Sequence, residues 1–357
     1  MEDLNKRTAQ RIRQLKNTLP AKVLERHFLQ IPSLRNKYSE RQKELYVEDV
    51  GYHISYLSES IAIESHALFA EYVGWLKTFF STLPVPESDL ILSFEILRDA
   101  LDENLDAEMK PISADYLNRG IEHFKNTHPL INTYITDDNP HKEIAEKYLN
   151  LLIDGDRRGA AKLIMDAHQN KISVRELYLN VFSVTQKETG RLWQMNKISV
   201  AQEHYITAAT QLIMSQLYPY LFNAVHRGRS IIVSCAPGEL HEIGARMVAD
   251  MFEMEGWDSY YYGANTPKES LLKAISEKKP DVLALSATMI FNISSIEHLI
   301  TEVRNEPAFD RVKILVGGYP FSVSDDLWRK IGADGFAGNP VDAIALAESL
   351  IEKAEAL

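Results

Sequence analysis

The sequence predicts a multidomain chain that joins all-α and α/β parts. Two stretches, about 45–135 and about 140–225, show helical patterns, and the first of them is unusually aromatic. From about residue 230 onward, short apolar β-rich runs alternate with helical patterns instead. We therefore expect an N-terminal all-α domain over 1–139, a four-helix bundle over 140–226, and a parallel sheet with helices over 227–357.

Composition and charge limit the functions to consider. A chain of 357 residues has room for two or three domains, and its formal net charge of -11 argues against a general affinity for nucleic acid or anionic membranes. The first 45 residues are an exception, with 11 Lys and Arg against 5 Asp and Glu. A solvated helix face or a partner-docking arm is the simpler explanation there, and direct DNA binding is not expected.

Cysteine usage and hydropathy point to a cytoplasmic protein. Cys235, the one cysteine, excludes an internal disulfide framework and a multi-cysteine metal site. The N-terminus lacks an apolar signal core, and no run approaches the roughly 20 apolar residues of a membrane span. We expect no membrane partner.

One broad apolar stripe marks the N-terminal domain. Its members step by three, four or seven residues, which predicts one helix ended by LPVPESD at 83–89. A second helix then begins at SFEILRDALDENL. The expected all-α domain is compatible with a globin-like arrangement. The stripe comprises Ile54, Leu57, Ile61, Leu68, Tyr72, Trp75 and Phe79.

Capping signals mark the helices of the bundle. Asp156 is placed to cap the second helix, and Ser173 with Glu176 and Ser199 with Gln202 form capping-box patterns before the third and fourth. Short connections make neighbouring helices antiparallel, so about 80 residues can enclose one core. The expected helices cover 140–153, 157–169, 174–195 and 200–221.

Five β/α units make up the C-terminal domain. Near-continuous apolar strands imply a parallel sheet with helices on both faces, in which ligands bind outside the carboxyl ends of the strands. The loops after 236, 263, 288, 318 and 338 should share that rim. The expected strands are SIIVSCA, DSYYYG, DVLALSAT, KILVGG and DGFAG, and the helices cover 241–255, 267–278, 293–304, 322–331 and 340–354.

The loop SCAPGELHEIG, residues 234–244, places a histidine at this rim. In the spacing E-x-H-x-x-G, His241 can offer one ring nitrogen to a metal while Glu239 bonds the other and fixes the tautomer. Gly244 removes a side chain where a bulky group would approach the helix. A loop histidine that merely caps the helix is the alternative.

Two further signals lie on the same rim. Ser286 ends the third strand, and Gly317 with Gly318 ends the fourth. This combination resembles the cobalamin-binding Rossmann domain, a flavodoxin-like fold with a five-stranded parallel sheet. The resemblance implies that His241 is the lower axial ligand of cobalt, that the corrinoid's nucleotide tail is buried in the sheet against Ser286, and that Gly317 and Gly318 wall the tail slot.

The same resemblance extends the set of residues expected to contact the cofactor. They flank the histidine or follow the third, fourth and fifth strands. The added residues are Leu240, Glu242, Ile243, Thr288, Tyr319 and Gly338.

The helix pair of the bundle carries a second motif. Trp193 precedes Glu203 and His204 by the spacing W-x9-EH, which resembles the CarH-type cobalamin-binding photoreceptors. That resemblance implies a base-off, His-on adenosylcobalamin whose upper face is covered by the tryptophan and whose adenosyl group contacts the Glu-His pair. Gln194 stands where that family has a histidine, which puts a bis-histidine photoproduct in doubt.

The whole-chain order of parts resembles the photocobilins, which add a biliverdin chromophore. His53, His66, Tyr72 and Trp75 are residue types that suit a linear tetrapyrrole, and Tyr52 and Tyr56 add aromatic surface. Cys235 lies outside this segment, so a thioether link there is excluded. An aromatic helical core without a ligand is the alternative.

Three functions remain open. The first is a light-sensing, non-enzymatic signal-transduction protein that changes conformation or oligomeric state, as a dimer or tetramer, when light breaks the cobalt–carbon bond, and that acts on an unknown signalling partner. The alternative is a corrinoid protein that carries methyl groups for a methyltransferase system, which explains His241 equally well but not W-x9-EH. An adaptor with a vestigial site ranks last.

Overall fold

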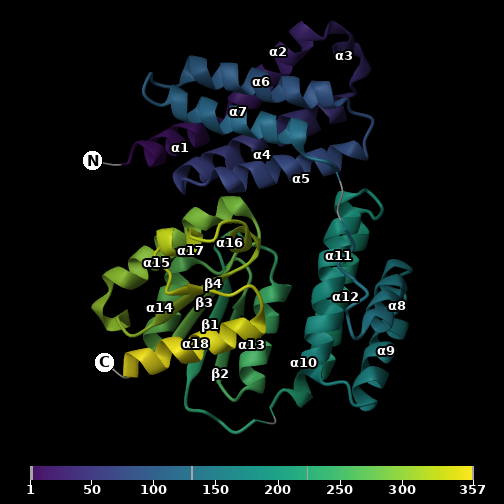
Figure 1. The fold of residues 1–357 in the computed structure, drawn as a ribbon, viewed down its shortest axis with the longest axis vertical. Helices are drawn as coiled ribbons and strands as arrows, with labels where there is room; N and C mark the ends of the chain where they lie inside the picture. The colour runs from purple at the N-terminus through teal and green to yellow at the C-terminus, as the bar shows by residue number, and fades with distance from the viewer. Residues whose placement is uncertain (1–2, 130–131, 223, 356–357) are drawn as a thin grey trace. The chain divides into compact units, whose positions relative to one another are not determined.

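The structure is a computed structural model that describes residues 3–129, 132–222 and 224–355 (Figure 1). It divides into two compact units. The first contains the N-terminal helices together with Met289–Ser294 and Ser322–Lys330, and the second contains the bundle and the rest of the sheet domain. The expected fold class, helical N-terminal parts followed by a five-stranded parallel sheet, is confirmed.

The N-terminal unit is built from helices around one aromatic and aliphatic core. Leu57, Val73, Leu97 and Leu117 come from four helices and are fully buried in that core. Burial of such side chains supplies the main stabilisation of a helical domain. The helices are α1 Leu4–Gln14, α2 Leu19–Gln30, α3 Pro32–Lys37, α4 Glu40–Ala62, α5 His66–Ser81, α6 Glu87–Asn104 and α7 Lys110–Asn126, with the 3-10 turn η1 Leu15–Asn17 after α1.

The apolar stripe expected on one helix spans two. α4 ends at Ala62 and α5 begins at His66, and between them Glu64 adopts a left-handed backbone with φ 53°. The backbone N–H of Ser65 bonds the carbonyl of Ser60 at 2.9 Å, which closes the end of α4. The single helix was therefore wrong, because apolar spacing continues across the break.

Within the basic first 45 residues, the described part from residue 4 onward is largely helical and contributes to the core. Ile12, Leu19 and Val23 are buried in the same core as α4 and α6, while Arg11, Arg35 and Lys37 lie on exposed faces. A solvated face describes the charges, and the apolar side chains of this segment are packed in the core. A role of this segment in docking a partner stays a prediction.

The bundle follows the capping signals closely. Asp156 accepts a hydrogen bond from the backbone N–H of Gly159 at 2.8 Å, and both expected capping boxes form at Ser173 and Ser199. Tyr148 and Phe182 are among the fully buried side chains of its core. The bundle helices are α8 Lys142–Ile153, α9 Arg157–Gln169, α10 Val174–Leu177, α11 Ser183–Gln194 and α12 Val200–Leu217, with the 3-10 turn η3 Tyr218–Tyr220.

The third bundle helix is interrupted by a π-helical turn. This turn, η2 Tyr178–Phe182, lies between α10 and α11, where one continuous helix was expected over 174–195. Thr185 also bonds back to the carbonyl of Val181 just after the turn. A π turn changes the backbone hydrogen-bond pattern but leaves the apolar face of the helix in place. The spacing of apolar residues therefore does not predict the turn.

Five parallel strands form the sheet in the order β2-β1-β3-β4-β5. Figure 1 shows α13 and α18 on one side of the sheet, where both contact its strands. Ile231, Val233 and Leu315 face that side and join the core shared with the bundle. The strands are β1 Ser230–Cys235, β2 Asp258–Gly263, β3 Val282–Ser286, β4 Lys313–Gly317 and β5 Gly335–Phe336.

The helices between the strands mostly match expectation. The exception is 322–331, where one helix was expected and two short helices occur instead, separated at Ser324–Asp326. Ser324 bonds the Asp326 carboxylate at 3.3 Å, a local bond that competes with helix continuation. The helices are α13 Ile243–Met254, α14 Lys268–Lys278, α15 Ile293–Asn305, α16 Tyr319–Val323, α17 Leu327–Lys330 and α18 Pro340–Glu355, with 3-10 turns η4 Ile290–Asn292 and η5 Pro307–Phe309.

Among the helices of the described ranges, none is both long and apolar enough to cross a membrane.

Candidate functional site

A buried carboxylate organises the loop after β1. Glu239 is 0% exposed, and its Oε1 accepts the backbone N–H groups of Leu240 and His241, each at 3.0 Å. Its Oε2 accepts the backbone N–H of Thr288, beyond β3, at 2.8 Å. A buried carboxylate is stable only when donors surround it, so this side chain fixes the loop after β1 against the loop after β3.

His241 is held by the same carboxylate. Its Nδ1 lies 2.5 Å from Glu239 Oε1, and its side chain is 57% exposed. A carboxylate cannot donate when ionised, so the bond places the proton on Nδ1 and leaves Nε2 as an acceptor. The hydrogen bond from His241 to Glu239 raises the pKa of the imidazole, against the effect of burial, and the charges of Glu239 and Glu203 add to the rise.

The loop lies at the point where the strand order reverses. β1 is flanked by β2 on one side and β3 on the other, so the connections leaving β1 and β3 run in opposite directions across the sheet. Ser286 at the end of β3 pairs with Cys235 of β1 and with Gly317 of β4. The geometry therefore brings His241, Ser286 and Gly317 to one edge, the usual ligand position of an open parallel sheet.

The two glycines after β4 allow close backbone approach. Gly318 has φ +105°, and a Cβ added there would lie 1.9 Å from the carbonyl oxygen of Ala287. A Cβ at Gly317 would lie 3.2 Å from the carbonyl oxygen of Ala337. The positive φ and the close Ala287 carbonyl are enough to require glycine at position 318. Its role as a wall of a ligand slot stays a prediction.

The remaining expected contacts line the same edge with mixed exposure. A Cβ built on Gly244 would meet only open space. Leu240 is 74% exposed and Tyr319 49% exposed, while Ile243 is buried beneath the loop. Thr288 is half-buried and Gly338 is exposed after β5. Exposed apolar side chains beside an imidazole acceptor suit a large, flat, partly apolar ligand.

Glu242 has partners inside the protein. Its carboxylate accepts from the Gln211 amide at 2.7 Å, the Tyr261 hydroxyl at 3.0 Å and the Ala264 backbone N–H at 3.2 Å. Glu242 was expected at the ligand, and Gln211 and Tyr261 were missed. Their sequence separation from Glu242 leaves no spacing signal. The Gln211 bond links α12 of the bundle to the rim, and the Tyr261 and Ala264 bonds link β2 and the loop after it to the rim.

Asn265, which holds the loop after β1 by two hydrogen bonds, was also missed, although its position in the sequence is typical of a turn residue. Its side chain accepts the Gly238 N–H at 2.9 Å, and its own N–H bonds the Glu239 carbonyl at 3.1 Å. Asn265 adopts φ 53°, a left-handed conformation that asparagine tolerates better than most residues. An asparagine in a turn just after β2, ahead of Pro267, is such a signal.

The W-x9-EH residues occupy the facing ends of α11 and α12. Trp193 is half-buried against the bundle core, and Gln194 beside it is buried. Glu203 and His204 bond each other at 2.5 Å, with the His204 side chain 76% exposed. The charge of Glu203 adds to the rise in the pKa of His241. Contacts of these residues with an adenosyl group stay predictions.

Both matched segments fall on this bundle and sheet. Residues 229–345 match the model of the B12 binding domain, and residues 144–218 match a second B12 binding domain model. These matches support a cobalamin-binding family.

Curated relatives agree with a cobalamin-binding chain. Monomethylamine corrinoid protein 1 of Methanosarcina mazei is 28% identical over 218 residues, which are 59% of this chain and 99% of that protein. The dimethylamine corrinoid protein of Methanosarcina barkeri is 30% identical over 122 residues, 34% of this chain and 56% of that protein. The solved monomethylamine corrinoid protein of Methanosarcina barkeri matches with a TM-score of 0.52 at 25% identity, over 59% of this chain and 99% of that one.

Two residues proposed for a bilin are buried together in the N-terminal core of this cobalamin-binding chain. His53 is 2% exposed, and its Nδ1 lies 2.7 Å from the hydroxyl of Tyr72. His53 also stacks on Phe94 at 4.7 Å, and Tyr72 stacks on Tyr56 at 3.7 Å. Burial lowers the pKa of His53 to about 3, so the ring is neutral.

The other two bilin candidates lie apart from this pair. His66, at the start of α5, bonds the Asp115 carboxylate at 2.7 Å and stacks on Tyr116 at 3.9 Å. Trp75 stacks on Phe79 at 5.4 Å. The structure gives each of these side chains a protein partner, and the biliverdin assignment stays a prediction.

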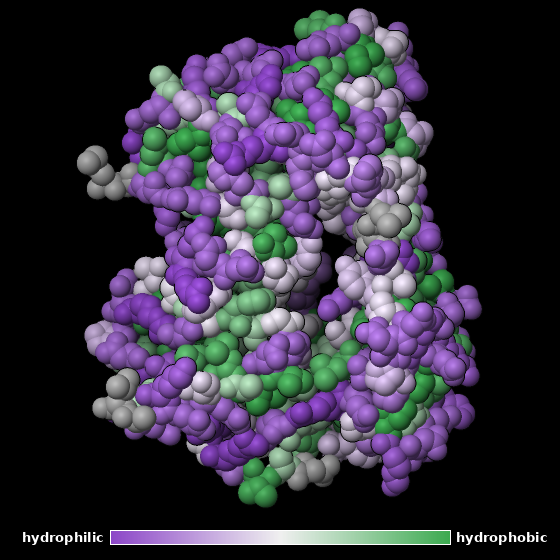
Figure 2. Space-filling view, viewed as in Figure 1, coloured by the Kyte–Doolittle hydropathy of each residue, from purple (hydrophilic) through white to green (hydrophobic). Residues whose placement is uncertain are grey.

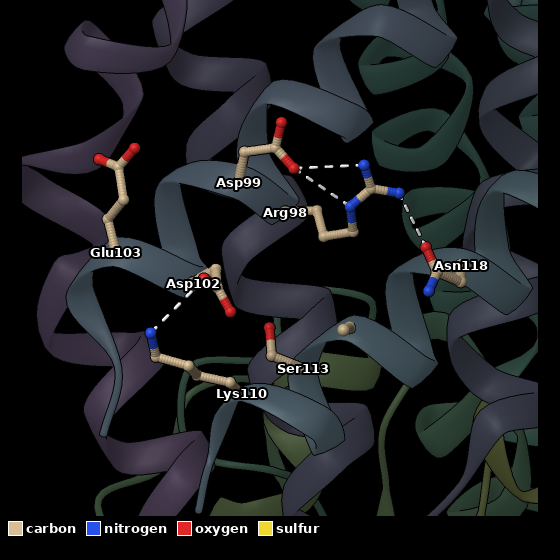
Figure 3. Close-up of a pocket in the computed structure, with 8 residues that line it drawn as sticks. Arg98, Asp99, Asp102, Glu103, Lys110, Ser113 and Asn118 are labelled. Carbon is tan, nitrogen blue, oxygen red and sulfur yellow. Dashed lines mark hydrogen bonds and ion pairs between the residues drawn. The ribbon is translucent and has the colours of Figure 1, made fainter. Parts of the chain in front are cut away.

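Two surface cavities lie away from the His241 loop. One, of about 360 Å³, lies between α6 and α7, and Figure 3 shows its charged lining. The other, of about 300 Å³, lies between the α8–α9 turn and the start of α12, and is lined in part by Ile153 and Tyr205. In the portion of the chain that the structure describes, no group of three or more His, Cys, Asp or Glu side chains could hold a metal ion.

Replacement of Gly318 tests the packing of the rim. Gly318→Ala places a Cβ against the Ala287 carbonyl at an unfavourable φ, so we expect a loss of roughly 3 kcal/mol or more in the free energy of unfolding, measured in urea. Gly190→Ala, where the added Cβ meets open space in a helix, serves as the control and should not destabilise. Equal stability of the two variants would contradict the close approach.

The buried His53 predicts acid sensitivity of the N-terminal helices. Because its folded pKa, about 3, lies below the unfolded value near 6.5, the unfolded chain takes up a proton first as pH falls between these values, and stability is lost there. Between pH 6.5 and 4.5 this amounts to about 3 kcal/mol at most. Urea unfolding at both pH values should show a smaller loss for His53→Gln than for the parent chain, and parallel losses would refute the assignment.

Proposed function

We propose that this chain is a corrinoid protein that carries a methyl group on cobalt for a methyltransferase system. The observation that carries the proposal is the Glu239–His241 pair, whose bond leaves Nε2 as an acceptor on a side chain that is 57% exposed, at the reversal point of the sheet. When bound, the corrinoid supplies a cobalt ion that can hold an alkyl group and release it to an acceptor.

The described residues fit a corrinoid at this edge. His241 would bind cobalt through Nε2, and Glu239 would keep the ring in the required tautomer. The open space at Gly244 and the exposed side chains of Leu240 and Tyr319 offer room and apolar surface for a macrocycle. Ser286 would hold the nucleotide tail beside Gly317, as the resemblance to the B12-binding domain implies.

The relatives favour this function over light sensing. Those named above are a monomethylamine corrinoid protein and a dimethylamine corrinoid protein, and the match covers 99% of the first of them and 59% of this chain. They therefore support the alternative, a methyl carrier, more strongly than a photoreceptor. That this chain has a methyltransferase partner and receives its methyl group from a methylated substrate is part of what we propose.

Light sensing is the second candidate, and one motif favours it. Trp193, Glu203 and His204 keep the W-x9-EH spacing, and the charge of Glu203 contributes to the raised pKa of His241. Preference for adenosylcobalamin over methylcobalamin, with a change in solution mass on illumination, would support this candidate. Preference for methylcobalamin, with methyl transfer to an added thiol acceptor and a methyltransferase fraction, would support the carrier.

His241→Ala tests the proposed ligand. Chain reconstituted with hydroxocobalamin and reduced to Co(II) should show nitrogen hyperfine splitting in its EPR spectrum from one axial imidazole, and His241→Ala should lose it. The matched control is His298→Ala, on the exposed face of α15, which should retain the splitting. Circular dichroism checks that the variants are folded. Retention of the nitrogen splitting in the EPR spectrum of His241→Ala would contradict the proposal.

A further inference from the structure

A charged groove on the N-terminal helices lies outside the cobalamin site. It has a volume of about 360 Å³ and lies between the C-terminal half of α6 and the first half of α7. Figure 2 shows mostly hydrophilic side chains over this helix pair. The groove is lined by Arg98, Asp99, Asp102, Glu103, Lys110, Ser113, Ala114 and Asn118.

The hydroxyl of Ser113 is the unexplained group in this groove. Ser113 is 3% exposed, and its Oγ is buried without a hydrogen-bond partner among the described residues. Figure 3 shows the hydroxyl directed into the space that Asp102, Lys110 and Arg98 surround. A buried hydroxyl left without a partner costs free energy, so its presence in a groove wall points to a polar group that reaches it from the groove.

The charged side chains of the groove differ in how many hydrogen bonds and ion pairs they form within the protein. Arg98 donates two bonds to Asp99 and one to Asn118, all at 3.3 Å or less. Glu103 forms a two-bond pair with Arg26, which lowers the pKa of Glu103. Asp102 instead has Lys110 at 3.5 Å, at the limit of a hydrogen bond. Asp102 is therefore the carboxylate with most capacity left for a ligand.

The least satisfied acceptors favour a cationic group. Arg98 pairs with Asp99, and Arg26, outside the lining, pairs with Glu103, which leaves Asp102 beside Lys110 as the carboxylate with the longest ion pair. An ammonium group needs several acceptors, and a carboxylate with a neighbouring hydroxyl oxygen supplies them. The methyl of Ala114 and the stems of Arg98 and Lys110 offer apolar surface for a short alkyl chain.

We propose that this groove binds a small aliphatic diamine. One ammonium donates to the carboxylate of Asp102 and to the Oγ of Ser113, and the second lies near Asp99, about one turn earlier on α6. The residues concerned lie outside the two segments that match B12 binding domains, so the proposal goes beyond cobalamin binding and does not depend on it.

Titration calorimetry of the full chain with 1,4-diaminobutane tests the proposal. The parent chain should bind, 1,4-butanediol should not bind measurably, and Mg²⁺ at equal ionic strength should not displace the diamine. Asp102→Asn should weaken binding at least tenfold and Ser113→Ala roughly threefold to tenfold, as expected for bonds to a charged group. Ser113→Ala removes a buried hydroxyl without adding volume, so its folding should be intact.

The matched control is Glu122→Gln, an exposed carboxylate on the same helix α7 outside the groove, whose affinity should stay within twofold of the parent. Three results would overturn the proposal. The first is that the parent chain does not bind the diamine. The second is an equal loss of affinity in Glu122→Gln and Asp102→Asn. The third is displacement of the diamine by Mg²⁺, which would show only a general attraction of cations to an acidic surface.

Discussion

The carboxylate of Glu239 is the constraint on which the site depends. It is fully buried and gathers two backbone N–H groups of its own loop, one from the loop after β3, and the ring nitrogen of His241. A buried charge with fewer donors would be costly, so the loop closes around it in one arrangement. The orientation of His241 is thereby a consequence of electrostatics in the loop.

The bundle is tied to the same edge by polar contacts. Gln211 of α12 donates to Glu242 at the rim, and Arg246 of α13 donates to Ser215 at 3.0 Å. Tyr178, in the π turn, donates to Asp250 at 2.7 Å, and burial raises the pKa of Asp250. Such bonds exchange readily with water when a bundle moves, whereas the apolar core shared with the sheet resists separation.

Local chemistry explains which features the sequence predicts. The helix caps at Asp156, Ser173 and Ser199, the strands and the pairing of Glu239 with His241 all rest on residues close in sequence, and the structure confirms each of these local features. The break at Glu64 was missed because the apolar stripe runs across it.

Long-range features left no comparable trace. The bonds of Gln211 and Tyr261 to Glu242, the approach of Ala287 to Gly318 and the buried hydroxyl of Ser113 follow from how distant segments pack. The order of the strands, which puts β1 beside β3, decides that Ser286 and Gly317 meet the histidine loop. Residue spacing in one sequence predicts that such distant residues lie close together only when it resembles a known motif.

The protonation state of His241 tests the central claim most directly. Long-range ¹H–¹⁵N NMR of the imidazole, recorded in the cofactor-free chain at a pH above its titration, reports which ring nitrogen carries the proton. We predict the Nδ1–H tautomer, with no proton on Nε2, and loss of that preference in Glu239→Gln. An Nε2–H tautomer in the parent chain would contradict it.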